Sequence, residues 1–334
     1  MRRSDHDELP VLPGRLQRLA DELQDEGVPA LEGAPHRIAA LVELAYALRP
    51  PYHEGRVPSY GALLPPPELL RAGAELRAPD TTVDLVDVHD LDVQFARRFA
   101  DGVTSFVVRS RDAIRHLACF GRNMADEYDL VGLQAALGGL VIQRHPGGQV
   151  RIFGPAGVVR WNGTRWLHDA PVDAWIARLS AVAPHVPVDH LRPVLRFAAH
   201  ELGGRRIGAT LIWRPGEHAV VGERHEALVH NVPPLRLGNV GEEGALAQAL
   251  AQTDGAAVFD RSATVVALGI RLVPSTAAEA AVGSMRGMRH TSALRYSYDD
   301  PESIVIVVSE AGPVTLMHAG RAITSVDPGE ERIG

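Results

Sequence analysis

Residues 207–213 of this 334-residue chain read Ile-Gly-Ala-Thr-Leu-Ile-Trp, and residues 304–309 read Ile-Val-Ile-Val-Val-Ser. Short apolar runs of this kind are typical of strands that are buried on both faces of a sheet. Between them, residues 256–259 and 263–270 predict two more strands around the turn Asp260-Arg261-Ser262. These runs indicate the centre of a sheet in the C-terminal half of the chain.

Helical segments alternate with these strands. The spacing predicts helices over residues 191–202, 242–252, 276–284 and 287–297, and the first ends at Gly203-Gly204. Residues 314–317 are expected to close a hairpin with residues 304–309 around Ala311-Gly312-Pro313. Helices alternating with strands around a mixed sheet describe an α/β domain.

The N-terminal half has a different pattern. Residues 16–23 and 38–45 show apolar residues at helical spacing. Short β-like runs follow Asp80, at residues 83–88, 103–109, 140–143, 150–153, 158–161 and 164–167. The last three are joined by tight turns and predict a β-meander, with Trp161 and Trp166 packed on one face. A helix over residues 172–182 is expected to end this half.

We therefore predict an α/β protein with two domains. A C-terminal mixed-sheet α/β domain covers residues 186–330, and a smaller α+β domain lies within residues 1–185. The boundary is expected at residues 184–187, Pro-His-Val-Pro.

Composition excludes several classes of function. The net charge of −7 argues against a surface built to hold nucleic acid, and no DNA-recognition motif is visible. All 34 basic residues are Arg, and a P-loop needs its Lys, so that class of nucleotide enzyme is excluded. Any anion site must use Arg, His, hydroxyls or backbone N–H groups.

Cellular location is suggested by three features. Cys119 is the only cysteine, so no internal disulfide can form and a reducing compartment fits best. Arg2 and Arg3 are followed by acidic residues and not by an apolar segment, so no signal peptide is expected. No run approaches the roughly 18 uncharged apolar residues of a transmembrane helix. We expect a cytoplasmic protein that does not contact a membrane.

Three places in the C-terminal half carry groups that suit chemistry. Asp254-Gly255-Ala256 offers a carboxylate that can hold a divalent cation or take a proton from a hydroxyl, although Asp-Gly is also a turn signal. Gly287–Ser292, at the start of a helix, combines free N–H groups with the guanidinium of Arg289, or is simply a solvated helix start. Ser309-Glu310 ends a strand and can direct a carboxylate to Mg²⁺ or Mn²⁺, or is an ordinary polar terminus.

The order of these segments resembles the diadenylate cyclase family. Its markers are an Asp-Gly-Ala motif, a Gly-Thr-Arg-His-Arg-type motif and a strand that ends in Ser-Glu, and the resemblance covers roughly residues 190–325. It implies that two domains meet face to face, each with one ATP, and condense the two molecules into cyclic di-AMP. ATP is therefore the implied substrate, and a homodimer or larger homo-oligomer the implied assembly.

The resemblance also implies roles for individual residues. Asp254 would bind Mg²⁺ or Mn²⁺ and activate the attacking hydroxyl, and Glu310 would help to bind the metal. Arg289 and His290 complete the implied catalytic set. The implied ATP-binding residues are Gly255, Ala256, Leu272, Gly287, Met288, Thr291, Ser292 and Ser309, with Leu272 facing the adenine.

Two residues depart from the family pattern. Met288 stands where Thr is usual, and Thr291 where a second Arg is common. The loss of one charge-assisted contact lowers affinity or rate by roughly one to two decades. A nucleotide-binding sensor without catalytic activity is therefore the alternative reading.

The N-terminal half resembles the sensor domains that accompany cyclases of this kind. This resemblance depends on overall layout and on the Gly-Pro-x-Gly…Asn-Gly…Trp region of the meander. The sequence does not identify the effector. A third reading is a hydrolytic metalloenzyme that uses residues of one loop, His218, Glu223, His225, Glu226 and His230, but no HExxH-like spacing supports it.

Overall fold

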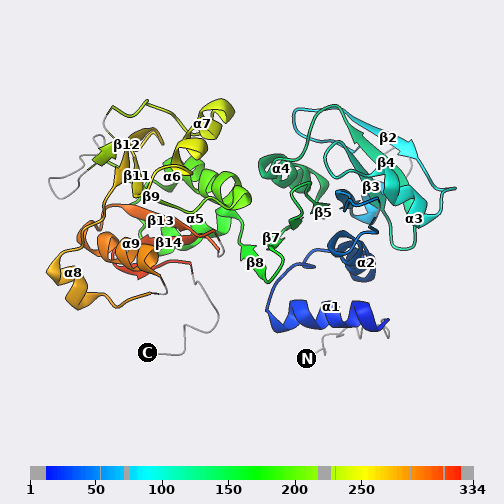
Figure 1. Cartoon of the computed structure of the whole chain (residues 1–334), viewed down its shortest axis with the longest axis horizontal. Helices are drawn as coiled ribbons and strands as arrows, with labels where there is room; N and C mark the ends of the chain where they lie inside the picture. The colour runs from blue at the N-terminus through cyan, green and yellow to red at the C-terminus, as the bar shows by residue number, and fades with distance from the viewer. Residues whose placement is uncertain are drawn as a thin grey trace. The chain divides into compact units, whose positions relative to one another are not determined.

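The computed structural model describes residues 13–52, 54–70, 76–216, 227–229, 231–285, 287–310 and 313–324. Contacts divide the chain into two units, Met1–His168 and Asp169–Gly334, shown in Figure 1. This division lies before the boundary expected at residues 184–187. The helix before the expected boundary, α5 (Val172–Val182), packs into the core of the second unit through Trp175 and Leu179.

The second unit contains a seven-stranded mixed sheet. Its central strand is β9 (Ala209–Trp213), which pairs in parallel with β11 (Ala256–Phe259) and antiparallel with β13 (Ile304–Val308). The other strands extend the order β10-β12-β11-β9-β13-β14-β15: β10 (Ala227–Val229), β12 (Val265–Ile270), β14 (Thr315–His318) and β15 (Arg321–Ala322). All residues of β9 and β13 are buried, as their apolar composition predicts.

Helices cover both faces of this sheet, which confirms the predicted α/β class (Figure 1). One face packs on α5, α7 (Val240–Leu250) and α6 (Val188–Arg196), which continues as a π-helical segment (Phe197–Gly203). The other face packs on α9 (Met288–Asp299), beside α8 (Thr276–Ala281). Side chains of β13 alternate between the two cores: Ile304 and Ile306 face one, Val305 and Val307 the other.

The first unit contains an eight-stranded sheet in the order β2-β4-β3-β1-β5-β6-β7-β8. Its strands are β1 (Tyr60–Leu64), β2 (Val83–Asp87), β3 (Ser105–Arg109), β4 (Ile114–Phe120), β5 (Leu140–Arg144), β6 (Val150–Gly154), β7 (Gly157–Trp161) and β8 (Trp166–Asp169). The predicted meander is confirmed as β6-β7-β8. Trp161 and Trp166 contact each other with ring centroids 5.1 Å apart.

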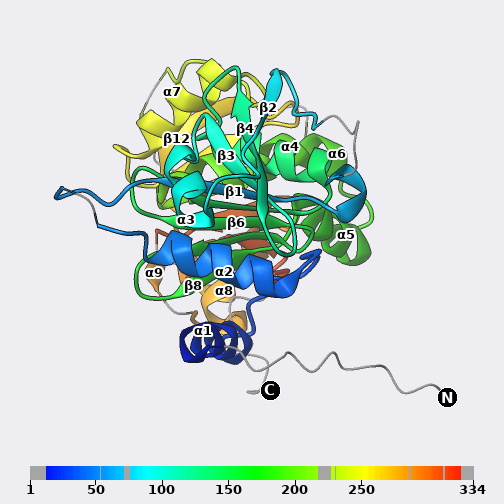
Figure 2. The ribbon, with the colours of Figure 1, turned by 90° about the vertical axis from the view of Figure 1, so that its right-hand side faces the viewer.

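Helices of the first unit also lie on both faces of its sheet. The helix α2 (Arg37–Leu48) covers one face and packs against α1 (Gly14–Asp25), as Figure 2 shows. The helix α4 (Glu127–Leu137) covers the other face. The short helix α3 (Val93–Ala96) lies before β3. Two short 3₁₀ helices, Pro67–Leu70 and Arg97–Phe99, complete the elements of this unit.

Some expectations for the first unit were incomplete. The sequence did not predict β1, β4 or α4, and the first unit, at 168 residues, is not smaller than the second, at 166. Cys119 lies on β4 and is half-buried, and burial raises the pKa of its thiol. No helix among the described residues has both the length and the apolar composition needed to cross a bilayer.

Candidate functional site

Strand register brings the predicted segments of the second unit to one edge of its sheet. Ala209, the first residue of β9, pairs with Val308, the last of β13, and Ala256, the first of β11, pairs with Ile270, the last of β12. Since β9 and β11 are parallel, both begin at this edge. At this edge, Asp254-Gly255 therefore lies just before β11, and Gly208 just before β9. At the same edge, Ser309-Glu310 follows β13 and Leu272 follows β12.

Arg289 and Glu310 converge on Gly208. A Cβ atom built on Gly208 would lie 2.5 Å from Nη1 of Arg289, 3.0 Å from Cγ of Glu310 and 3.2 Å from its Oε1. Arg289 comes from the first turn of α9 and Glu310 from the end of β13. The missing side chain of Gly208 thus leaves room for a guanidinium and a carboxylate at the start of the central strand.

The N-terminus of α9 provides an anion-binding geometry beside Arg289. Its N-cap, Gly287, has φ of +93°, and no described side chain caps the helix. The first backbone N–H groups and the positive end of the helix dipole can therefore receive an anion. Met288 is 88% exposed and adds no polar group.

Thr291 holds the loop before α9. Its Oγ1 accepts a hydrogen bond from the backbone N–H of Met285 (3.0 Å) and lies 3.1 Å from the carbonyl oxygens of Met285 and Gly287. The hydroxyl has one proton and can donate to one of these oxygens at a time. Thr291 therefore fixes the loop that carries the anion-binding N–H groups.

Asp254-Gly255-Ala256 forms the entry to β11 from the α7 side. Asp254 is exposed, and Ala256 is buried within the strand. Gly255 has φ of +96°, and a Cβ there would lie 2.7 Å from the carbonyl carbon of Gly269. Only glycine fits this position, and it turns the chain so that the carboxylate stands at the sheet edge. Because this segment joins the helix α7 to the strand β11, Asp254 does not lie in a turn between two strands.

The remaining predicted residues lie around this edge. Glu310 is exposed, whereas His290, Ser292 and Ser309 are half-buried. Leu272 is half-buried and packs against the core beneath α9. The edge therefore combines two exposed carboxylates, an exposed guanidinium and a partly apolar border.

The carboxylates suit a divalent cation that is shared with a phosphate ligand. Asp254 and Glu310 offer the oxygen ligands that Mg²⁺ and Mn²⁺ prefer, and Mg²⁺ in nucleotide sites is usually held by one or two carboxylates plus phosphate oxygens. Within the described part of the chain, no group of three or more His, Cys, Asp or Glu side chains forms a metal cluster. The five residues expected for a hydrolytic site lie outside the described residues: His218, Glu223, His225, Glu226 and His230.

The far end of α9 is fixed by a polar cluster. Nη2 of Arg214 donates to the hydroxyl of Tyr296 (2.8 Å) and to the carboxylate of Asp300 (2.7 Å). Burial, opposed by the charge of Arg214, raises the pKa of Tyr296 to about 12. Because Arg214 follows β9 directly, the cluster ties the helix to the central strand and so positions Arg289 at its other end.

The sequence did not predict the roles of Gly208 and Arg206. Gly208 was noted only as part of a small-residue strand, and its close approach to two charged side chains needs the strand register. Nε of Arg206 donates to the main-chain oxygen of Glu310 at 3.5 Å. The only local signal was the pair Arg205-Arg206 before a strand with Gly at its start.

Two known protein families match this sequence, one in each of the two units. Residues 17–169 match the family described as "Probable sensor domain DACNK", and residues 196–322 match the family described as "DisA bacterial checkpoint controller nucleotide-binding". No curated protein matches the sequence significantly.

Two solved structures show distant likeness. A hypothetical membrane spanning protein from Bacillus cereus is 17% identical over 45% of this chain and 69% of its own, with a TM-score of 0.31. A double mutant of DacA from Staphylococcus aureus is 19% identical over 41% of this chain and 87% of its own, with a TM-score of 0.25.

Proposed function

The chain belongs to the proteins that combine a DACNK sensor domain with a DisA-type nucleotide-binding domain, and from this premise we propose that it is a diadenylate cyclase. Two ATP molecules would give cyclic di-AMP and two pyrophosphates. In each half-reaction a 3′-oxygen forms a bond to the α-phosphorus of the other ATP, pyrophosphate leaves, and the hydroxyl proton is removed.

The convergence of Arg289 and Glu310 at Gly208, on the sheet edge that also carries Asp254, is the observation that supports this proposal most strongly. Phosphoryl transfer depends mainly on positioning and on stabilising negative charge. A guanidinium, an open helix N-terminus and two carboxylates at one edge supply these needs together.

The start of α9 is the proposed triphosphate cradle. The planar guanidinium of Arg289 donates hydrogen bonds to phosphate oxygens, and the backbone N–H groups after Gly287 add further donors. The side chains of His290 and Ser309 complete the cradle. Thr291 acts indirectly, because its hydroxyl is used to fix the loop before the helix. Leu272 offers an apolar surface for the adenine.

Asp254 and Glu310 are the proposed ligands of Mg²⁺ or Mn²⁺. When bound, such an ion neutralises phosphate charge and lowers the pKa of a coordinated hydroxyl. Asp254, exposed at the entry to β11, is also positioned to accept the proton of the attacking 3′-hydroxyl.

The chemistry requires two copies of the second unit. One site holds one ATP and offers one 3′-hydroxyl, so the symmetric double displacement needs a second site that faces it around a two-fold axis. The proposed working species is therefore a homodimer or a larger symmetric assembly.

A nucleotide-binding sensor without activity is the second candidate. Met288 is 88% exposed and offers no phosphate donor, and the hydroxyl of Thr291 is used within the loop. Such a protein would bind ATP at the same edge and leave it unchanged.

The two candidates differ in product. Purified protein is incubated with ATP and each of Mg²⁺, Mn²⁺ and Co²⁺, and the mixture is separated by chromatography. Formation of one cyclic di-AMP and two pyrophosphates for every two ATP consumed supports the cyclase. Intact ATP in all three metals, together with measurable ATP binding, supports the sensor.

A further inference from the structure

The α2 face of the first unit buries two arginines beside a single carboxylate. Glu43, on α2, is fully buried, and Arg97 and Arg109 are 4% and 9% exposed. Burial and the neighbouring Glu43 carboxylate raise the pKa of the Tyr60 phenol well above its usual value, so Tyr60 is neutral. The cluster therefore has one positive charge more than its carboxylate can balance.

Arg97 and Tyr60 together take most of the hydrogen-bonding capacity of the Glu43 carboxylate. Nε of Arg97 donates to Oε2 at 2.9 Å and its Nη2 to Oε1 at 2.7 Å, a bidentate pair, and its guanidinium lies 4.5 Å from the ring centre of Tyr46. The hydroxyl of Tyr60 donates to Oε2 at 2.5 Å. Three hydrogen bonds thus occupy this carboxylate before Arg109 is considered.

Among the described residues, none forms a hydrogen bond with Arg109. Its Nη1 lies 3.3 Å from Oε1 of Glu43, which is ion-pair distance without hydrogen-bond alignment. Both Nε and Nη1 are buried, and the described part of the chain offers neither atom a hydrogen-bond partner. Among the residues that the structure describes, Glu43 is the one acidic side chain within ion-pair distance of Arg109. A buried guanidinium in this condition is unfavourable unless a further acceptor completes its hydrogen bonds.

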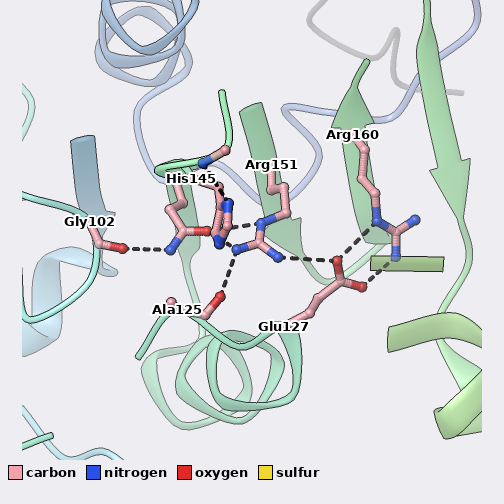
Figure 3. A network of polar contacts seen from close by, with 8 residues as sticks. Gly102, Ala125, Glu127, His145, Arg151 and Arg160 are labelled. Carbon is pink, nitrogen blue, oxygen red and sulfur yellow. Dashed lines mark hydrogen bonds and ion pairs between the residues drawn. The ribbon is translucent and has the colours of Figure 1, made fainter. Parts of the chain in front are cut away.

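A second Arg-Glu-Arg cluster in the same unit shows what Arg109 lacks. On the α4 face, Glu127 lies between Arg151 and Arg160 (Figure 3). There the extra guanidinium, that of Arg151, donates to Oε1 of Gln143 (2.9 Å from Nε) and to the carbonyl oxygen of Ala125 (2.7 Å from Nη2). Neutral acceptors of this kind are what Arg109 is missing.

The local fold directs Arg109 into its cluster and keeps it near the surface. The pairing of β3 with β4 shifts register between Val108 and Arg109, and such a bulge re-aims a side chain. Arg109 is the last residue of β3, and the turn that follows places Arg111 and Asp112 in solvent. Arg109 keeps 9% of its surface exposed beside this turn, so the cluster lies just beneath the surface of the unit.

We propose that the first unit is a receptor for a small oxyanion, the carboxylate or phosphate group of a metabolite, which the guanidinium of Arg109 binds beside the Glu43–Arg97 pair. An oxyanion supplies the acceptors that Arg109 lacks and balances the extra charge. This assignment does not depend on the cyclase activity proposed for the second unit.

The test uses the full-length protein in an Arg289→Ala background, which weakens phosphate binding at the second unit, and the comparison of Arg109 variants within this background isolates the first unit. Thermal unfolding is measured with sodium chloride, phosphate, sulfate or acetate at equal ionic strength. Arg109→Met is compared with Arg111→Met, a matched control two residues away on the exposed turn. Phosphate or acetate should raise Tm of the background protein and of the control by about 3–5 °C at roughly ten times the dissociation constant. Arg109→Met should lose this shift, and Arg109→Lys, which keeps the charge without the fork, should keep part of it.

A second readout separates binding from a purely structural role. In chloride alone, Arg109→Met should be at least as stable as the background protein, because it removes an unbonded buried charge, whereas Arg97→Met should unfold at a clearly lower temperature. In an arginine side-chain NMR spectrum, the Nε–H signal lost in Arg109→Met should move during titration with the effective anion. The proposal is overturned if no oxyanion raises Tm beyond chloride, or if Arg109→Met responds as fully as the control.

Discussion

Nη1 of Arg289 and the carboxylate of Glu310, which are 21 residues apart in sequence, meet at the position where a side chain on Gly208 would stand. This relationship joins the start of α9, the end of β13 and the start of β9. The distances make a specific prediction, because a methyl group at Gly208 would have to displace the far end of Arg289, and not the backbone.

Gly208→Ala should therefore leave the fold intact and lower the rate of cyclic di-AMP formation. The displaced guanidinium loses a charge-assisted contact, which corresponds to a decrease of roughly ten- to a hundredfold. The matched control is Gly244→Ala inside α7, where a Cβ would meet no atom within 4 Å. That change should stabilise the helix by roughly 0.5–1 kcal/mol and leave the rate unchanged. Equal rates for both variants would show that the approach to Gly208 is unimportant.

The boundary between the units predicts which shortened chains fold. A chain that starts at Asp169 keeps α5, and it also keeps the bond from the backbone N–H of Val314 to Oδ1 of Asp169 (2.9 Å). A chain that starts at Val186 loses α5 and this hydrogen bond. With α5 it loses the buried side chains of Trp175 and Leu179, and the burial of each contributes about 1.5–3 kcal/mol to the free energy of unfolding. Urea unfolding should show the longer chain to be several kcal/mol more stable. Equal urea midpoints for the two chains would show that α5 does not stabilise the second unit.

Assembly should control the rate. If two second units must meet for each turnover, the rate per chain at saturating ATP should rise with protein concentration and level off when the dimer is complete. Enzyme dilution combined with light scattering measures both quantities. A rate per chain that stays constant where the protein is monomeric would contradict the two-site reaction.

The buried network of the first unit should make its stability depend on pH. His145 is half-buried; its Nδ1 accepts from the N–H of Gly147 (3.0 Å), and burial, with Arg151 nearby, lowers its pKa (Figure 3). The unfolded state therefore binds a proton more readily, so stability is full above about pH 6.5 and falls as the pH falls below it. His145→Asn should flatten the Tm profile of this unit between pH 7 and pH 5.

His89 is the matched control for this experiment. It is exposed, and its hydrogen bond and ion pair with Asp87 raise its pKa. Any stability it contributes is present below its unfolded pKa and lost as the pH rises, which is the opposite sign, and solvent screening makes it small. His89→Asn should therefore not flatten the acid side of the profile. An unchanged profile in His145→Asn would assign the acid sensitivity to other groups.

Much of the second unit could be predicted because the sequences of its central strands are uninterrupted apolar runs. Residues 256–259 form β11 as predicted, and β9 and β13 differ from the predicted ranges by one or two residues. The order of Asp254, Arg289 and Glu310 along the chain also indicated a common site. Their meeting at one edge could not be derived, since it depends on the register of β9 with β11 and β13.

The first unit was harder to predict for physical reasons. β1 lies between Pro58 and the three prolines 65–67, a composition typical of connectors, yet all five of its residues are buried at the centre of the sheet. The two Arg-Glu-Arg clusters join residues up to 66 positions apart, as in Glu43 and Arg109, and no local pattern marks them. Charged residues in strands are normally expected at the surface.

The most direct test of the account compares wild-type protein with Asp254→Asn for ATP binding and for conversion of ATP to cyclic di-AMP in the same metal-containing buffer. Asparagine keeps the size of the side chain and removes its charge, so it weakens a metal ligand and removes a proton acceptor while it leaves the Arg289 cradle in place. We predict that wild-type protein forms cyclic di-AMP, and that Asp254→Asn binds ATP within a few-fold of the wild-type affinity and forms none. Wild-type turnover in Asp254→Asn would contradict the central assignment.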